Sequence, residues 1–363
     1  MGELIKPLHG LRGIAALTVV AGHYGFPGSA SFGVVLFFVL SGYLMGRLYL
    51  PKTFDLRSVW IYLSARFARV YPLFAFVVIG VALINVYTGA SIFKLEPWQV
   101  DDHLLLYGSN RTIWTICVEF QFYGLFVLFW WLTSKFGYPR LWATGTVFLG
   151  LLWATLTYDP TERMDILGYL HVFAIGILIA LFDEDLAKFP KRWAHIGLIV
   201  SLALYGVVYM VARQLSIDED IFINPWAVAV CGAILVFTMA AGDCWANRML
   251  SLKPAVWLGE ISFGMYLLHR PVQALIYETG LNALHPIAKV SLAMAIVLVV
   301  SHLALKLLEE PARNALRDWS HKILSYSLWR RLAVWYGTVR HNPKEPLGTH
   351  TQESMEADTA GKA

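Results

Sequence analysis

Long runs of apolar residues are the feature of this sequence that most restricts its fold. Residues 71–88 and 286–307 are two examples, each close to the ~20 apolar residues that cross about 30 Å of hydrocarbon as a helix. Hydrophobic residues make up 57% of the chain and charged residues 15%, whereas a soluble domain carries about a quarter charged residues. In lipid, each backbone polar group must find its partner inside the segment. The sequence therefore predicts an all-α polytopic membrane protein.

We predict about ten transmembrane helices from these runs. The predicted spans cover residues 10–25, 32–50, 71–88, 113–133, 140–157, 165–182, 193–212, 225–242, 261–279 and 286–307. With the N-terminus in the cytoplasm, most loop Lys and Arg residues fall on the inner side, for example Arg47, Lys52 and Arg57. The positive-inside rule thus predicts a multi-pass protein of the cell (inner or plasma) membrane with both termini cytoplasmic.

The sequence also predicts how the chain is divided into regions and which partners its charge favours. We expect a transmembrane domain over residues 1–311, an interfacial amphipathic helix over 312–340 and a disordered cytoplasmic tail over 341–363. The net charge of +4 follows from the basic inner loops, so membrane lipids are expected partners and nucleic acid is not. The cysteines form no C-x-x-C pair, and no metal site is expected.

Two polar residues inside the first predicted span call for an explanation. Arg12 and His23 are eleven residues apart, which is about three helical turns, or about 16 Å, and places both side chains on one helix face. A central arginine costs about 2.5–3.5 kcal/mol even on lenient insertion scales. Taken alone, Arg12 could be a residue at the membrane edge whose side chain reaches the lipid phosphates. Taken alone, His23 could be a histidine that forms a hydrogen bond between helices. Together on one face, they favour a functional site.

Further charges lie in or beside other spans. Arg66 and Arg69 are three residues apart at the inner surface, and a pair of guanidiniums suits a ligand that carries phosphate, although a lipid anchor is the alternative. Glu119 lies inside an aromatic span. An isolated carboxylate there is too costly, so it must be protonated, paired or exposed to a wet cavity.

A third group of residues has weaker signals. His269 and Arg270 precede Pro271, which removes a helical hydrogen bond and predicts a kink lined by protein; structural and functional interpretations are both open for them. Ser41 fits close helix packing. Trp114 and Tyr123 fit belt or core positions. The candidates for lining a cavity around the site are Ser41, Trp114, Tyr123, His269 and Arg270.

Six segments in one order carry a family resemblance. They are Arg12 with His23, "FFVLSGYL" at 37–44, "RFARVYP" at 66–72, "IWTICVEFQFY" at 113–123, "LGEISFGMYLLHRPV" at 258–272 and "EEP" at 309–311. Together they resemble the membrane-bound acyltransferase 3 family of O-acyltransferases, and residues 1–311 would then be its transmembrane domain. The resemblance covers residues 8 to 314.

The resemblance implies an enzyme that takes an acyl group, usually acetyl, from cytoplasmic acyl-CoA. The acceptor would be a hydroxyl of a surface or exported saccharide or glycolipid. Acyl-CoA is then a co-substrate, and no bound cofactor is expected. By this resemblance, His23 and Arg12 carry activity together with the pair Arg66 and Arg69. Because the donor carries phosphates, we expect the three arginines to bind it.

The chemistry of acyl transfer fits these residues. Transfer to an alcohol needs a base of near-neutral strength, which imidazole supplies, so His23 is the candidate general base or a transient acyl carrier. Glu119 is the second candidate catalytic residue, which would orient His23 or form a charge pair with it. The alternative function is a multi-span transporter or flippase for an anionic or sugar substrate, although no paired Gly/Pro-broken segments mark two repeats.

Overall fold

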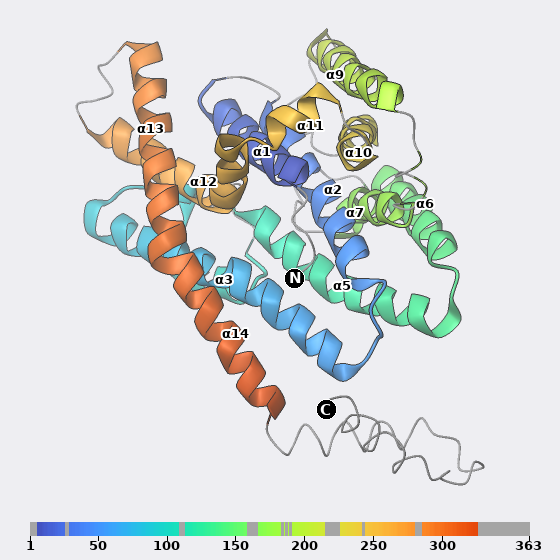
Figure 1. The fold of residues 1–363 in the computed structure, drawn as a ribbon. Coiled ribbons are helices and arrows are strands. Elements are labelled where there is room, and N and C mark those ends of the chain that lie inside the picture. The colour runs from blue at the N-terminus through green and yellow to red at the C-terminus, as the bar shows by residue number, and fades with distance from the viewer. Residues whose placement is uncertain are drawn as a thin grey trace, which may run out of the picture. The chain divides into compact units, whose positions relative to one another are not determined.

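The computed structural model describes residues 6–25, 29–108, 113–157, 166–182, 185, 188, 191–214, 226–241, 244–279 and 285–325. Every regular element in these ranges is helical, as predicted (Figure 1). The longer helices are α1 (Lys6–His23), α2 (Ser29–Tyr49), α3 (Leu56–Thr88), α5 (Trp114–Phe136), α6 (Pro139–Leu156), α7 (Ile166–Ala180), α9 (Lys191–Gln214), α10 (Trp226–Ala241), α12 (Lys253–Glu278), α13 (Pro286–Ala304) and α14 (Glu310–Ser325). The short elements are η1 (Ile92–Lys94), η2 (Pro97–Gln99), α4 (Val100–Leu104), α11 (Trp245–Leu250) and η5 (Leu305–Glu309).

Each of the ten predicted spans overlaps one of the longer helices. Within the described ranges, five helical segments are long and apolar enough to cross a membrane: Ala30–Tyr49, Leu56–Thr88, Trp114–Phe136, Trp193–Val211 and Ile287–Leu324. Two shorter apolar helices cover Ile166–Ala180 and Val228–Ala240. The chain therefore has the apolar helices of a membrane protein, while the number ten and the cytoplasmic placement of both termini stay predictions.

The chain divides into two compact units, Met1–Arg317 and Asp318–Ala363. The first contains most of the helices, including the whole region predicted as the transmembrane domain. The predicted interfacial helix over 312–340 is helical as far as Ser325, and its remainder lies outside the described residues. The predicted tail over 341–363 also lies outside them.

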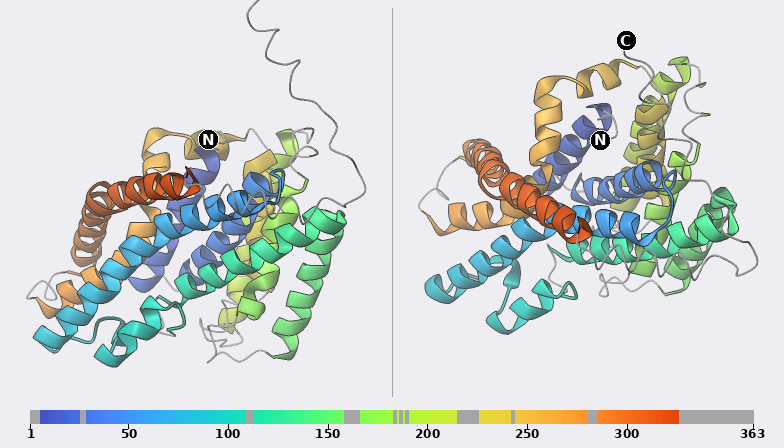
Figure 2. Two further views of the ribbon diagram at one scale, coloured as in Figure 1. Left: turned by 90° about the horizontal axis from the view of Figure 1, so that it is seen from below. Right: turned by 60° about the horizontal axis from the view of Figure 1, so that its bottom comes forward.

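Helix α1 occupies the centre of the first unit. It packs along α12 and α2, α2 packs along α7, and α6 packs on α7 (Figures 1 and 2). Glycines allow this close approach: a Cβ on Gly259 of α12 would overlap the carbonyl oxygen of His9 on α1. A Cβ on Gly42 of α2 would likewise overlap the carbonyl oxygen of Phe173 on α7. Small residues at such contacts are the usual means of bringing membrane helices together.

Local signals explain where several helices begin and end. Asp55 caps α3 by accepting a hydrogen bond from the backbone N–H of Ser58 at 2.8 Å, and Gly89 ends the helix with a φ of 71°. Helix α12 continues through Pro271 and changes direction along its length (Figure 1). A kink at this proline was expected because proline cannot donate the backbone hydrogen bond that the preceding turn needs.

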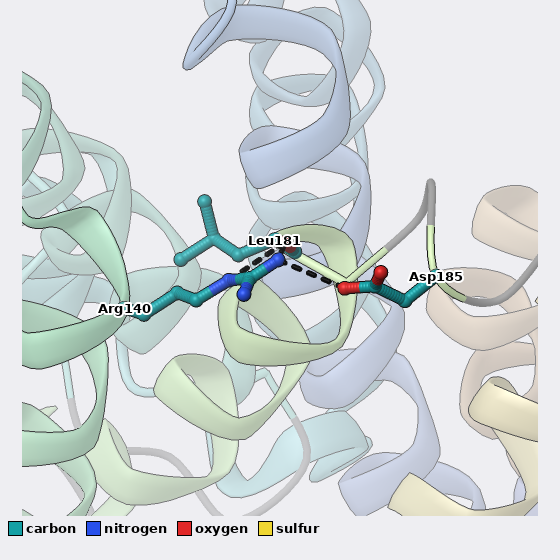
Figure 3. A network of polar contacts seen from close by, with 3 residues as sticks. All are labelled: Arg140, Leu181 and Asp185. Carbon is teal, nitrogen blue, oxygen red and sulfur yellow. Dashed lines mark hydrogen bonds and ion pairs between the residues drawn. The ribbon is translucent and has the colours of Figure 1, made fainter.

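A basic residue stabilises the end of α7. The Arg140 guanidinium on α6 donates hydrogen bonds at 3.1 and 3.3 Å to the carbonyl oxygen of Leu181, just beyond α7, and pairs with Asp185 at 3.0 Å (Figure 3). A cation at a helix C-terminus satisfies carbonyl groups that the helix leaves open and interacts favourably with its dipole. The groups are exposed, so this network contributes little to stability.

The packing of α2 on α7 gives the first prediction. Gly176→Ala places a Cβ against the backbone of Val39 and Tyr43, and we expect a loss of about 1–3 kcal/mol because the two helices must separate. Thermal unfolding of the purified protein in detergent measures the effect. Gly145→Ala on α6 is the matched control, since its Cβ meets no atom within 4 Å. Equal unfolding temperatures for the two variants would contradict the close α2–α7 contact.

Candidate active site

Helix α1 presents both of its polar residues to α12. Arg12 lines a cavity together with Phe263 and Tyr266 of α12, and the ring of His23 lies against the ring of His269 on the same helix. This agrees with the common face that the eleven-residue spacing predicts. His23 is the last residue of α1, because the chain turns at Tyr24 and at Gly25, which has a φ of 109°. The histidine therefore lies at the end of the helix.

Three arginines form one cluster beside α1, which we call the arginine cluster: Arg12, Arg66 and Arg69. Their side chains are half-buried and interact electrostatically with one another. The carboxylates that interact with Arg12 come from Glu119 on α5 and Glu309 on η5. Three positive charges against two negative ones leave an excess of positive charge inside the helix bundle, which suits an anionic ligand.

Arg66 shows how the cluster is held. Its Nη2 donates to the Tyr49 hydroxyl at 3.5 Å, and the guanidinium carbon lies 5.8 Å from the centre of the Tyr49 ring. Such a cation–π contact stabilises a cation without consuming all of its donors. The Arg66 Nε is buried without a hydrogen-bond partner among the described residues. One donor in the cluster is therefore left for a ligand.

Glu119 is the hydrogen-bond acceptor at the centre of the site. Its Oε1 accepts from the Ser41 hydroxyl at 3.0 Å and from the Tyr123 hydroxyl at 2.6 Å. The Arg12 guanidinium supplies the opposite charge. The positive charge and the two hydrogen bonds offset the cost of removing this carboxylate from water. The structure thus brings the predicted residues Arg12, Ser41, Glu119 and Tyr123 into one network.

A small cavity lies between α1, α2, α5 and α12. Its volume is about 40 Å³, room for a few water molecules. A substrate enters this space only if the surrounding side chains or helices move. The lining residues are Arg12, Val34, Phe37, Phe38, Ser41, Thr115, Ile116, Glu119, Phe263 and Tyr266.

Two histidines meet where α1 ends, and we call them the histidine pair: His23 and His269. Their ring centres are 4.9 Å apart and the rings are inclined by 58°. His269 is fully buried, while His23 is half-buried. Gln273 of α12 donates to the carbonyl oxygen of His23 at 2.9 Å and accepts from Arg270 at 3.0 Å. These bonds fix the end of α1 on α12.

Trp114 lies beside the cavity without lining it. It is buried, and its ring centre lies 5.1 Å from that of Tyr169 and 6.1 Å from that of Phe38, which does line the cavity. Sequence reasoning missed Thr115, which donates to the Tyr266 hydroxyl at 2.6 Å. It also missed Glu309, although that residue stands in a segment used for the family resemblance.

No group of three or more His, Cys, Asp or Glu side chains in the described residues is arranged to hold a metal ion. The cationic side chains of the site are the residues that could hold an anionic co-substrate. The arginine cluster offers guanidiniums for phosphate, and the histidine pair offers imidazole for proton transfer. The cavity of about 40 Å³ is lined by Arg12 of the cluster and by Tyr266, whose carbonyl oxygen accepts a hydrogen bond from His269 Nδ1.

Comparison with known proteins identifies the class to which this fold and site belong. The sequence model described as an acyltransferase domain matches residues 5–306. The chain belongs to this acyltransferase family, as the sequence motifs indicated. No solved structure matches the chain.

Several curated relatives are similar over most of the chain. It is 24% identical to the peptidoglycan O-acetyltransferase OatA of Listeria monocytogenes, over 92% of this chain and 60% of the relative. It is 23% identical to the putative peptidoglycan O-acetyltransferase YrhL of Bacillus subtilis, over 91% and 58%. It is 26% identical to the acyltransferase MdmB of Streptomyces mycarofaciens, over 73% and 78%. The chain thus spans about three fifths of the length of the first two.

The hydrogen bonds of Glu119 give a second prediction. Glu119→Ala removes the acceptor of two hydroxyl groups and a counter-charge of Arg12, so we expect a loss of about 1–3 kcal/mol in stability. Glu119→Gln keeps an acceptor oxygen and should lose less. Thermal unfolding in detergent ranks the variants, with Glu260→Gln, an exposed glutamate on α12, as the control. If Glu119→Ala unfolds like Glu260→Gln, the network contributes nothing.

Proposed function

We propose that this protein is an integral membrane O-acyltransferase, most simply an O-acetyltransferase. It would move an acyl group from cytoplasmic acyl-CoA to a hydroxyl of a surface or exported saccharide or glycolipid. The observation that carries this proposal is the arginine cluster, whose Arg12 lines a cavity, together with an imidazole at the C-terminal end of the same helix α1. Membership of the acyltransferase family supports it.

We assign acyl-CoA as the donor because of the positive charge of the arginine cluster. Coenzyme A carries several phosphates, and guanidiniums bind phosphate through parallel hydrogen bonds. Arg12, Arg66 and Arg69 supply more positive charge than Glu119 and Glu309 neutralise. In the ten-span arrangement that the basic inner loops favour, this end of α1 would lie on the cytoplasmic side, where acyl-CoA is available.

The acceptor hydroxyl is assigned to the other end of α1. His23 Nδ1 lies 2.9 Å from the carbonyl oxygen of Val19. A carbonyl can only accept, so Nδ1 carries the hydrogen and Nε2 is the basic nitrogen of the neutral ring. We assign Nε2 as the general base that takes the proton of the hydroxyl as its oxygen attacks the thioester carbonyl. Glu119 holds Arg12 and the cavity wall in place.

The names of the relatives bear on the acceptor. Two of them are named for peptidoglycan, a saccharide polymer outside the membrane. We therefore propose a saccharide hydroxyl at the outer side, with the protein in the cell (inner or plasma) membrane. Acyl transfer across the bilayer would then follow the polar face of α1.

Donor binding gives the third prediction. Arg69→Gln should weaken the binding of coenzyme A about tenfold or more, because one charged phosphate contact is lost. Titration calorimetry of the protein in detergent measures the dissociation constant. Arg57→Gln is the matched control, since Arg57 is an exposed arginine on the same helix and should bind as the wild type does. Equal weakening by both variants would contradict a specific site at the cluster.

Catalysis gives the fourth prediction. Purified protein with radiolabelled acetyl-CoA and a saccharide fraction of the cell envelope should form labelled esters. His23→Ala should lower this rate at least about 100-fold, the usual contribution of a general base, while coenzyme A still binds. A His23→Ala protein with the wild-type rate would rule out His23 as the base.

A further inference from the structure

Arg270 on α12 carries a positive charge that no carboxylate of the described residues neutralises. The side chain is half-buried. The groups whose charges act on it are the phenols of Tyr24, Tyr266 and Tyr277, and no Asp or Glu side chain in the described part of the chain is among them. A half-buried guanidinium between apolar helices is costly without an opposite charge. Arg270 therefore calls for an anionic partner.

This cation is separate from the arginine cluster. The carboxylates of Glu119 and Glu309 act on Arg12 near the start of α1. Arg270 is instead connected to His23, the last residue of α1, which is about 16 Å further along the helix. The two cationic groups therefore lie at opposite ends of α1, and an anion at one of them does not occupy the other.

Hydrogen bonds hold the Arg270 guanidinium toward the end of α1. Its Nη1 donates to Gln273 Oε1 at 3.0 Å, and Gln273 Nε2 donates to the carbonyl oxygen of His23 at 2.9 Å. An arginine that only anchors a helix in lipid extends its side chain to the headgroup phosphates. The guanidinium of Arg270 is instead attached, through one glutamine, to the residue that carries the candidate base.

The other donors of this guanidinium have no acceptor among the described residues. Nε is buried without a hydrogen-bond partner there, whereas Nη2 has neither a partner there nor full burial. Nε and Nη2 share one edge of the planar group, and such an edge matches two oxygens of a carboxylate or a phosphate. An anion can thus bind at Nη2, and a small rotation of the side chain brings Nε to it as well.

The neighbours of Arg270 suit a ligand that carries both hydroxyl groups and negative charge. Tyr277 follows Arg270 by seven residues, which is about two turns, so both lie on one face of α12. Its side chain is 52% exposed, so this face can be reached from outside the helix bundle. Lys289 on α13 adds a second cation, with Nζ 5.2 Å from the centre of the Tyr277 ring. Phenol hydroxyls donate and accept hydrogen bonds, as sugar hydroxyls do.

We propose that Arg270 binds an anionic group of the acceptor, a carboxylate or a phosphate, and so holds the acceptor hydroxyl near His23. The acceptor is then a saccharide that carries negative charge close to the hydroxyl that receives the acyl group. The catalytic part of this statement rests on the proposed acyl transfer, whereas the binding part depends on Arg270 alone. Arg270 is in this role a residue that determines acceptor specificity.

A matched pair of acceptors isolates the charge. A disaccharide with one glucuronic acid unit carries a carboxylate, and its methyl ester is the same sugar without the charge. With acetyl-CoA as donor, wild-type protein should use the acid about tenfold better than the ester, measured as the ratio of the two kcat/KM values. Arg270→Gln should lower this ratio to about one, because the charged contact is lost.

Two further variants complete the kinetic test. Arg213→Gln is the matched control, since Arg213 is an exposed arginine near the end of α9, and it should keep the wild-type ratio. Arg270→Lys keeps the charge without the planar edge and should keep part of the preference. A change in folding or in the action of His23 alters the rates with both sugars equally and leaves the ratio unchanged. A wild-type ratio in Arg270→Gln, or a ratio of one in wild type, overturns the proposal.

Binding without acyl transfer separates this proposal from the proposed function. Saturation-transfer NMR, with the protein in a detergent that contains no phosphate, measures the dissociation constants of both disaccharides. Wild type should bind the acid about tenfold more tightly than the ester, and Arg270→Gln should bind both equally. If wild type shows this preference but forms no ester with either sugar, the proposed function fails and the anionic site stands.

The same binding measurement decides against a lipid phosphate as the partner of Arg270. In that case the acid and the ester bind wild type equally, or neither binds, and Arg270→Gln does not differ from wild type with either sugar. Each of these results overturns the proposal.

Discussion

The neutralisation of the half-buried arginine cluster is the interaction on which the rest of this structure depends. Arg12, Arg66 and Arg69 stand close together among apolar helices, a placement that is stable only when carboxylates and hydrogen-bonding groups face them. Glu119 and Glu309 supply that charge from two helices that lie far apart in the sequence. The cluster therefore fixes how α1, α3, α5 and the segment after α13 meet.

Helix α1 connects this cluster to the histidine pair. Its glycines bring it close to α12, so that Arg12, the cavity and His23 lie along one interface. The Tyr266 side chain lines the cavity, and its carbonyl oxygen holds His269. A single residue thus contacts both sets of polar groups. Under the proposed function, one set binds the phosphates of the donor and the other handles the proton of the acceptor.

Helix periodicity was sufficient to predict the arrangement of part of this site from the sequence. The spacing of Arg12 and His23 predicted a common face. The cost of burying a carboxylate predicted that Glu119 would be protonated, paired or exposed to a wet cavity, and in the structure it lines a cavity and accepts hydrogen bonds from Ser41 and Tyr123. Neighbours on other helices could not be predicted in the same way, because packing between distant segments decides them. The contact of His23 with His269 is of this kind.

Glu309 escaped sequence analysis for a different reason. It lies in the π-helical segment Leu305–Glu309, where the extra residue per turn rotates every following side chain away from the face that a regular helix predicts. The position of His23 at the end of α1 was within reach of the sequence, since Gly25 follows it and takes the left-handed backbone conformation that ends helices.

The most direct test of acyl transfer along α1 separates the two substrates by a membrane. The protein is reconstituted into sealed vesicles, with radiolabelled acetyl-CoA only on the side of the arginine cluster and a peptidoglycan-derived saccharide only on the other. If α1 carries the transfer, labelled ester forms on the far side with the wild-type protein and not with His23→Ala. Ester formation only when both substrates share one side would contradict transfer across the membrane through this site.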